Sequence, residues 1–220
     1  MVLRLGVLAS GRGTSLQAML DAAARGELPA EVVVVLSNRP SAKALERARA
    51  AGVPAFAMPQ KRFPDLRARD LAMLERLRKY QVDLVVLAGY DRVFRTPEFL
   101  EAFPERILNM HPSLLPAFGG EGAMSPKPQA DALAYGCKVA GCTVILVVPG
   151  QIDGGPIVAQ AAVPVYDDDT VETLAGRILR AEHRTLLEAI RLFAGGNVRV
   201  EGRRVLTGTR RPLDEPAAPE

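Results

Sequence analysis

The sequence predicts a single α/β domain of Rossmann-like type, with a mostly parallel, twisted sheet and helices on both faces. Three observations support this prediction. Short apolar runs alternate with segments of helical period, 220 residues are enough for one sizeable core, and residues 83–90 (DLVVLAGY) form an almost unbroken apolar run. Such runs are typical of parallel strands that are buried on both faces.

The first half of the chain alternates between strand and helix. Strands are expected at residues 3–10, 31–38, 54–59, 83–90 and 106–111. Helices are expected at residues 15–26, 42–52 and 65–81, with a short one near 96–103. Repeats of this kind join parallel strands through helices that pack on the sheet.

The alternation breaks after residue 116. Residues 117–128 are rich in glycine and proline and are predicted to form a mobile loop. The elements that follow are a helix at 129–136, strands at 140–148 and 156–165, an amphipathic helix at 170–196 and a hairpin at 197–206. Asp169 or Thr170 can cap the long helix. We expect one domain over residues 1–200, with the end of the hairpin and a disordered tail in 201–220.

Composition and charge narrow the class of partner. The formal net charge is +3, spread along the chain, which suits an anionic small molecule, and the basic runs typical of nucleic-acid binders do not occur. No apolar run reaches the length of a membrane span, and the N-terminus shows no leader. Cys137 and Cys142 fit two buried thiols, and no cluster has metal-ligand spacing. We therefore expect a soluble, cytoplasmic, metal-free protein that binds neither nucleic acid nor membrane.

Function is expected in the segments that directly follow the predicted strands. In open parallel sheets, ligands bind beyond the carboxyl ends of the strands. The segments concerned are residues 10–15, 89–94, 109–116 and 149–155. We expect them to meet at one edge of the sheet.

The segment SGRGTSLQ, residues 10–17, has the composition of a phosphate-binding loop. Its glycines allow a close backbone approach, Thr14 and Ser15 offer hydroxyl groups and an N-cap, and the following helix supplies free N–H groups. A dinucleotide site would need a glycine in place of Leu16 and an acidic residue in place of Asn38. The alternative is a tight turn that binds no ligand.

The segment ILNMHPSLLP, residues 107–116, contains one of the two histidines of the chain. Asn109 and His111 are two residues apart on a strand, so both side chains point to the same face. An imidazole can relay protons near neutral pH, and a carboxamide can donate a hydrogen bond to a developing oxyanion. The alternative is a histidine that is merely satisfied at a strand end.

The segment GQIDGGP, residues 150–156, places Asp153 between an apolar strand and two glycines. A carboxylate at the edge of the sheet can take up a proton from a reacting group. The alternative is an ordinary turn, because Asp-Gly is a common turn dipeptide.

The segment AGYDRVF, residues 88–94, leaves a buried strand sharply. Arg92 stands between Tyr90 and the apolar pair Val93 and Phe94, which could form the wall of a flat pocket. The alternative is a loop that leads into the next helix.

Taken in this order, the four segments resemble the formyltransferases that use 10-formyltetrahydrofolate. The resemblance covers residues 2 to 196, and it is carried by GRGTSLQA, VVLAGYDRVF, RILNMHPSLLP, IDGGPIVAQ and AEH at 181–183. The glycine-rich first loop favours the branch that formylates glycinamide ribonucleotide in purine synthesis. The resemblance implies a formyltransferase fold over residues 1–200, small-molecule substrates, 10-formyltetrahydrofolate as co-substrate, and a monomer or homodimer.

The resemblance also implies roles for particular residues. The catalytic asparagine, histidine and aspartate of the family fall on Asn109, His111 and Asp153. The loop that holds the phosphate falls on Gly13, Thr14 and Ser15, and the glutamate that reaches the ribose falls on Glu182. The folate contacts fall on Asn109 and on Asp91, Arg92, Val93 and Phe94, whose backbone reads the pterin. Arg67 is a candidate for a further arginine that binds folate.

The chemistry that the resemblance implies is direct formyl transfer. The substrate amine attacks the formyl carbon, Asn109 and protonated His111 stabilise the oxyanion, and Asp153 passes a proton to the departing folate nitrogen. Two departures from the family pattern stand out. Residues 143–146 lack a histidine that the family carries there. The segment between His111 and Asp153 is longer, and it reads GGEGAMSPKPQADA where the family commonly has a histidine or another polar group after the SLLP motif.

Length argues against two related activities. A methionyl-tRNA formyltransferase would need a further C-terminal domain, and a formyltetrahydrofolate deformylase would need an N-terminal regulatory domain. A non-catalytic module that binds a nucleotide or folate is the alternative from another class. The joint presence of Asn109, His111 and Asp153 favours the enzyme.

Overall fold

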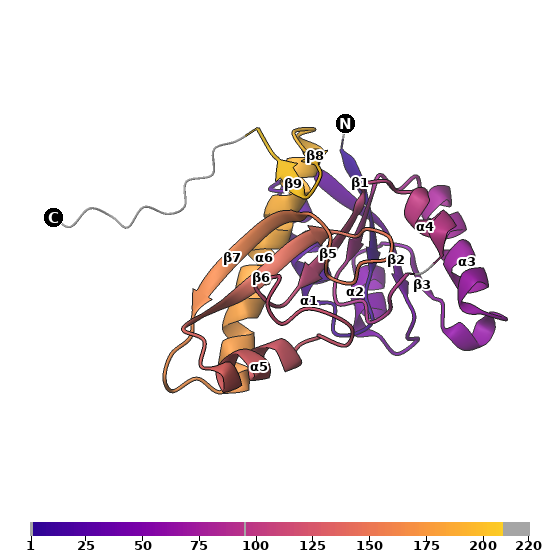
Figure 1. The fold of residues 1–220 in the computed structure, drawn as a ribbon. Helices are drawn as coiled ribbons and strands as arrows, with labels where there is room; N and C mark the ends of the chain where they lie inside the picture. Colours follow the sequence, from indigo (N-terminus) through magenta and orange to yellow (C-terminus); the bar gives the residue numbers. More distant parts are fainter. Residues whose placement is uncertain (1, 95, 209–220) are drawn as a thin grey trace.

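The computed structural model describes residues 2–94 and 96–208 (Figure 1). The first half contains β1 (Leu3–Leu8), α1 (Thr14–Ala24), β2 (Ala30–Ser37), α2 (Lys43–Ala50), β3 (Ala55–Ala57), the 3-10 helix η1 (Gln60–Arg62), α3 (Leu66–Lys79), β4 (Leu84–Leu87), α4 (Pro97–Glu101) and β5 (Ile107–His111). The second half contains α5 (Lys127–Tyr135), β6 (Val139–Leu146), β7 (Ile157–Pro164), α6 (Val171–Ala194), β8 (Arg199–Glu201) and β9 (Arg204–Leu206).

The described strands form one nine-stranded sheet in the order β3-β2-β1-β4-β5-β6-β7-β9-β8. All neighbours from β3 to β5 pair in parallel. β6 is antiparallel to β5, β7 is antiparallel to β6, and the hairpin of β8 and β9 joins the sheet through a parallel contact with β7. The predicted α/β fold with a mostly parallel sheet is confirmed, and the antiparallel pairs begin where the strand–helix alternation breaks.

The order of the strands reverses between β1 and β4. Along the chain, β2 and β3 are added on one side of β1, and β4 and β5 are added on the other. In open parallel sheets, ligands bind in a crevice at such a point, beyond the carboxyl ends of the strands. The segments that follow β1 and β4 therefore lie where a ligand is expected.

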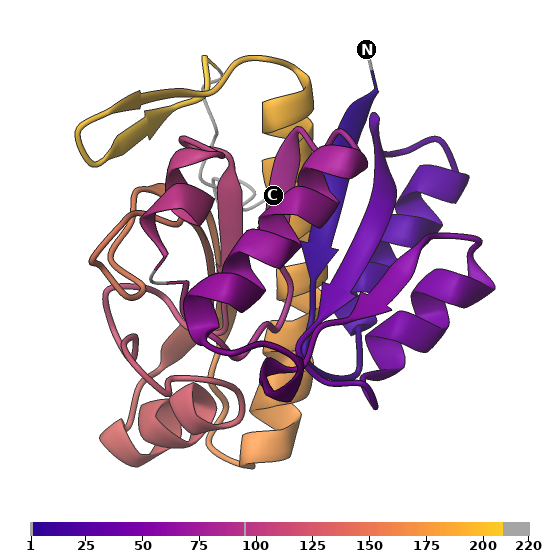
Figure 2. The same ribbon diagram turned by 90° about the vertical axis from the view of Figure 1, so that its right-hand side faces the viewer.

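Helices cover both faces of the sheet, as Figure 2 shows. α1, α2 and α6 pack on one face, around a core that includes Leu16, Leu45 and Ile178. α3 and α4 pack on the other face, around a core that includes Leu77 and Phe99. The central strands are buried on both sides, which explains why β4 reads as the unbroken apolar run LVVL.

The long helix α6 has the sequence signals of a capped amphipathic helix. Thr170 is its N-cap, and the side chain of Thr170 accepts a hydrogen bond from Thr173 N while Thr173 Oγ1 accepts one from Thr170 N. Of the two predicted caps, Thr170 is therefore the one that is used. Asp169 instead accepts hydrogen bonds from the Arg177 guanidinium at 2.7 and 2.8 Å.

Several predicted boundaries differ from the structure. The strand predicted over residues 83–90 ends at Leu87, because the chain turns at Gly89, which has a φ of 69°. The loop predicted over 117–128 ends at residue 126, because Lys127 and Pro128 already form the first turn of α5. The predicted disordered tail lies mainly in residues 209–220, outside the described residues.

Candidate active site

The segments after β1, β4 and β5 share one edge of the sheet, as predicted for parallel strands. The same argument is wrong for residues 149–155. Because β6 runs antiparallel to β5, this segment leaves the sheet at the opposite end. The loop then turns back along β5, and this return brings Asp153 to Asn109 and His111.

Asn109, His111 and Asp153 form a compact polar group. Asn109 Nδ2 donates a hydrogen bond to Asp153 Oδ1 at 3.3 Å, and His111 Nδ1 lies 3.3 Å from Asp153 Oδ2. The side chains of His111 and Asp153 are 3% and 12% exposed. The three side chains that were predicted to act together therefore lie in contact, in a site that excludes most of the solvent.

Residues 118–120, which fall in the predicted mobile loop, hold this polar group in place. The Phe118 carbonyl oxygen lies 3.2 Å from His111 Nε2, and Gly120 N donates to Asp153 Oδ2 at 3.0 Å. A carbonyl oxygen can only accept, so His111 Nε2 carries a hydrogen. His111 is thus held from both sides, by the Phe118 carbonyl oxygen and by the Asp153 carboxylate.

Thr143 stands in the stretch where the resembling family carries a histidine, and it ties the chain beyond His111 to the sheet. Its buried hydroxyl group donates to the Ser113 carbonyl oxygen at 2.7 Å. It accepts hydrogen bonds from Leu115 N and Gln160 Nε2, both at 3.0 Å. The path of the chain as it leaves β5 is thus fixed by side chains of β6 and β7.

Replacing Thr143 with valine keeps the shape of the side chain and removes its hydroxyl group. The buried Leu115 N–H then loses its acceptor, and an unsatisfied buried group of this kind costs about 1–3 kcal/mol. We expect the free energy of unfolding to fall by about 2 kcal/mol, as measured by urea titration. An unchanged urea midpoint would contradict a stabilising role for this network.

At Gly13, the backbone of the predicted phosphate loop lies very close to α2. Gly13 has a φ of 69° and is the N-cap of α1, and a Cβ at Gly13 would lie 2.7 Å from Ala44 Cα. Only glycine fits there without a shift of α2. No side chain caps α1, so the predicted capping role of Thr14 or Ser15 is wrong. The N–H groups of the first turn consequently remain uncapped by side chains, which leaves them available to an anion.

The predicted folate segment divides into inward and outward side chains. Phe94 is buried, with its ring stacked between those of Tyr90 and Phe99 at centroid distances of 5.4 and 3.9 Å. Arg92 is 57% exposed and Val93 is 43% exposed. A ligand at this segment can therefore meet the backbone and the outward side chains, whereas the Phe94 ring serves the core.

Arg67 lies in the first turn of α3, away from the polar group on β5. Its guanidinium is 65% exposed and forms an ion pair with Glu98 of α4. Surface ion pairs of this kind are weak, so Arg67 can exchange Glu98 for another carboxylate. The structure brings Arg67 next to α4 but into no contact with the residues of the polar group.

Glu182 lies on α6, where it faces β6. Burial raises the pKa of Glu182 to about 7, and no hydrogen bond or ion pair from another described residue holds its carboxylate. Its charge contributes to the raised pKa of the nearby Cys142 thiol, which is about 11 mainly because of burial. Glu182 is therefore a carboxyl group with free hydrogen-bonding capacity that is set apart from Asn109, His111 and Asp153.

The raised pKa of Glu182 predicts that the stability of the protein depends on pH. Its pKa in the folded protein, about 7, lies above the unfolded value of about 4.5, so the folded state binds the proton more tightly. The stabilisation is complete below pH 4.5 and is lost as the pH rises through 7, by about 3 kcal/mol in total. We expect Glu182→Gln to be more stable than the parent at pH 8 and similar at pH 5 in urea titrations. Glu75 is exposed, so in the control variant Glu75→Gln the free energy of unfolding should change with pH as it does in the parent. If Glu182→Gln showed the same pH dependence as the parent, the prediction would be refuted.

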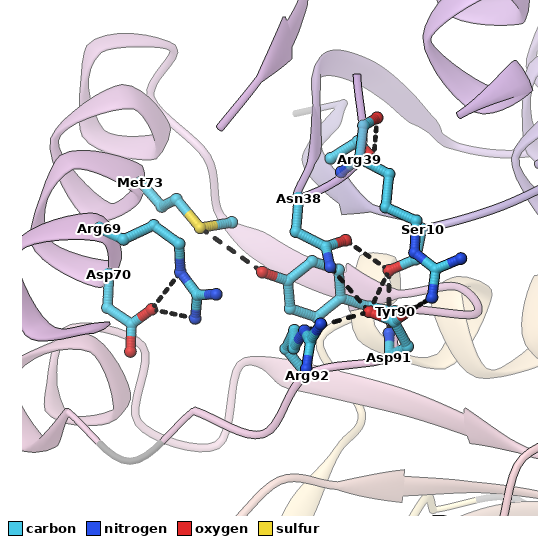
Figure 3. Close-up of polar contacts among 10 residues, drawn as sticks. Ser10, Asn38, Arg39, Arg69, Asp70, Met73, Tyr90, Asp91 and Arg92 are labelled. Carbon is cyan, nitrogen blue, oxygen red and sulfur yellow. Dashed lines mark hydrogen bonds and ion pairs between the residues drawn. The ribbon is translucent and has the colours of Figure 1, made fainter. Parts of the chain in front are cut away.

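A second polar cluster, which the sequence did not predict, surrounds Asp91 at the end of β4 (Figure 3). Ser10 from the end of β1 and Asn38 from the end of β2 both contact the Asp91 carboxylate, and Arg39 forms an ion pair with it. The rule that function follows strand ends already pointed to Ser10 and Asp91. Asn38 and Arg39 also directly follow a strand, so the same rule applies to them.

One surface cavity lies away from these clusters. It has a volume of about 330 Å³ between α4, the loop after β6 and the terminal hairpin, and none of the predicted site residues lines it.

No helix within residues 2–94 and 96–208 is long and apolar enough to cross a membrane. In the same part of the chain, no three His, Cys, Asp or Glu side chains are grouped so as to hold a metal ion.

Comparison with known proteins assigns the chain to a family. The sequence pattern of the formyl transferase family matches residues 3–190, a range that includes the polar group on β5, the first loop and Glu182. The chain belongs to the formyl transferase family.

Three relatives support this assignment, and two of them match this chain over more than nine-tenths of their own length. A phosphoribosylglycinamide formyltransferase of Mycobacterium tuberculosis (strain CDC 1551 / Oshkosh) is 46% identical over 205 residues, which cover 93% of this chain and 91% of the relative. The glycinamide ribonucleotide transformylase 1 of Symbiobacterium toebii is 56% identical, with a TM-score of 0.87 and 93% of each chain covered. The trifunctional purine biosynthetic protein adenosine-3 of Chironomus tentans is 41% identical over 199 residues, 90% of this chain and 14% of that protein. The formyl transferase fold predicted for this chain is thereby confirmed.

Proposed function

We propose that the protein transfers the formyl group of 10-formyltetrahydrofolate to the primary amine of glycinamide ribonucleotide, a step of purine biosynthesis. The observation that carries this proposal is the contact of Asn109, His111 and Asp153 in a chain of the formyl transferase family. Relatives of nearly equal length are named for this reaction. The folate acts as a co-substrate, and the proposed chemistry needs no metal.

The reaction is a direct transfer between two substrates that are held side by side. The amine lone pair forms a bond to the formyl carbon, and the carbonyl oxygen becomes an oxyanion. The bond between that carbon and the folate nitrogen then breaks, and the folate nitrogen takes up a proton that the amine has released. Bringing both substrates together in one orientation supplies much of the rate enhancement.

The polar group on β5 offers the donors and the proton carrier that this reaction needs. Asn109 is partly exposed and has N–H groups that can donate to the oxyanion. Both ring nitrogens of His111 are engaged, by Phe118 and Asp153, so its main contribution is the positive charge beside the oxyanion. Asp153 lies beside His111, and its carboxylate can pass a proton, through water, from the amine to the folate nitrogen.

The ribonucleotide is proposed to bind along the crevice that follows β1. Gly13, Thr14 and Ser15 would hold its phosphate through the uncapped N–H groups of α1. Glu182 would contact the ribose hydroxyl groups with its otherwise unpaired carboxyl group. Both assignments rest on the family resemblance and on these free hydrogen-bonding groups.

The folate is proposed to bind between the segment after β4 and the polar group. The backbone of Asp91, Arg92, Val93 and Phe94 would read the pterin, Asn109 would reach the formyl group, and Arg67 would pair with the glutamate of the folate. The exposed guanidinium of Arg67 and the outward Arg92 support this orientation. We further propose that residues 1–200 form the formyltransferase domain and that it works in the cytoplasm as a monomer or homodimer.

A spectroscopic assay of folate deformylation, run with and without glycinamide ribonucleotide, tests this function. We expect turnover only when the ribonucleotide is present. Turnover without it would indicate a formyltetrahydrofolate deformylase, because water would replace the amine. No turnover in either case, despite binding of both compounds, would indicate a non-catalytic binding module.

A further inference from the structure

The Asp91 carboxylate, which follows β4, is fixed by residues that follow two other strands, β1 and β2 (Figure 3). Asn38 Nδ2 donates to Asp91 Oδ1 at 2.8 Å, and Ser10 Oγ lies 3.0 Å from the same oxygen. The other oxygen, Oδ2, forms an ion pair with Arg39. Ser10 Oγ also lies 2.6 Å from Asn38 Oδ1, and because its hydroxyl group has one hydrogen, it donates to one of these two oxygens at a time.

Charge and burial show that Asp91 is the centre of this cluster. The Asp91 side chain is 10% exposed, whereas Arg39 and Arg92 are 58% and 57% exposed. Burial raises the pKa of Asp91, but hydrogen bonds from Asn38 and Ser10 together with Arg39 outweigh it and hold the pKa below its usual value. The carboxylate is therefore ionised at neutral pH and pulls the three strand ends together.

Hydrogen bonds of the backbone also join the segment after β4 directly to Ser10. Ser10 N donates to the Gly89 carbonyl oxygen at 3.0 Å, and Asp91 N donates to Ser10 Oγ at 2.9 Å. The segment after β4 is thus bonded on both sides of Tyr90 to the residue that precedes the loop at Gly11–Gly13. In turn, the Gly11 carbonyl oxygen accepts from Ala44 N at 3.1 Å, which fixes that loop against α2.

We propose that Asp91 is a positioning residue that couples the two substrate sites, so that binding of the ribonucleotide strengthens binding of the folate. This inference rests on the proposed function, which places the ribonucleotide on the first loop and the folate after β4. A ligand that orders the first loop also orders Ser10, and Ser10 shares its hydroxyl group with Asp91 N and the Asp91 carboxylate. The second ligand then meets a segment that is already in place, which is the physical basis of positive coupling.

The test measures the Kd of tetrahydrofolate by calorimetry with and without saturating glycinamide ribonucleotide. The ratio of the two values is the coupling factor, and we expect about 5 or more in the parent chain, within the usual range for coupled sites. Asp91→Asn should bring the factor to about 1–2 and raise both Kd values, with little change in Tm. Ser10→Ala leaves the contacts of Asn38 and Arg39 with Asp91 in place and should also lower the coupling factor. It is the test variant to use if Asp91→Asn does not fold.

Arg39→Gln is the matched control. It removes a positive charge and the ion pair but leaves the bonds from Ser10 and Asn38, so the coupling factor should stay within about twofold of the parent. If Arg39→Gln lowered the coupling factor as much as Asp91→Asn does, the effect would be one of surface charge, and the positioning role of Asp91 would be refuted. If the parent chain binds both ligands but its coupling factor is near 1, the coupling is refuted and the proposed function is not affected. If either ligand fails to bind, the proposed function is contradicted.

Discussion

His111→Ala and Asp153→Asn are each expected to lower the kcat of formyl transfer by about 10²–10⁴-fold, the range for loss of a positioned proton carrier. His111→Ala removes the imidazole that is held between Phe118 and Asp153. Asp153→Asn keeps the size of the side chain but removes the carboxylate that contacts His111 and Asn109. Both changes leave Asn109 and the substrate loops in place, so the KM values should change far less than kcat.

The measurement is steady-state kinetics with glycinamide ribonucleotide, together with circular dichroism to show that each variant is folded. Asp167→Asn is the matched control, because that carboxylate is 92% exposed and pairs with Lys138. Its kcat should equal that of the parent. If a folded His111→Ala or Asp153→Asn variant kept kcat within a few-fold of the parent, the proposed mechanism would be wrong.

The fold was predictable because its signals are local. The unbroken apolar run of β4, the helical stripe of α3 and the cap at Thr170 each act within one element, and each can be read from a few adjacent residues. That Asn109 and His111 lie on one face was predictable for the same reason, since side chains two apart on a strand point to the same side. Element ends were less accurate, because they depend on single turns such as the one at Gly89.

The approach of Asp153 to this pair depends on the path of a loop, which local patterns do not encode. Asp153 lies beside Asn109 and His111 as predicted, but for a different reason, since β6 is antiparallel and its loop has to return along β5. The network of Thr143 and the cluster around Asp91 join residues that are far apart in the sequence. Such contacts become visible only when the strand order is known, because any Ser, Asn or Thr has many possible partners.

Breaking the buried ion pair of Arg69 and Asp70 is expected to cause the largest loss of stability. Both side chains are 2% exposed, Arg69 Nη2 lies 2.7 Å from Asp70 Oδ1, and Thr96 Oγ1 donates to Asp70 Oδ2 at 2.8 Å. Asp70→Ala leaves a buried guanidinium without this carboxylate, which costs about 3–5 kcal/mol. That is a large share of the total stability of a domain, which is about 5–15 kcal/mol.

Urea titration of Asp70→Ala measures this loss, and a second variant separates the charge from the packing. In the triple variant Arg69→Met, Asp70→Leu and Thr96→Val, apolar groups replace all three partners, so most of the stability should return. The control Asp131→Ala breaks an exposed pair with Lys127 and should cost less than about 1 kcal/mol. If Asp70→Ala cost no more than Asp131→Ala, the buried pair could not be what holds α3 against the segment that enters α4.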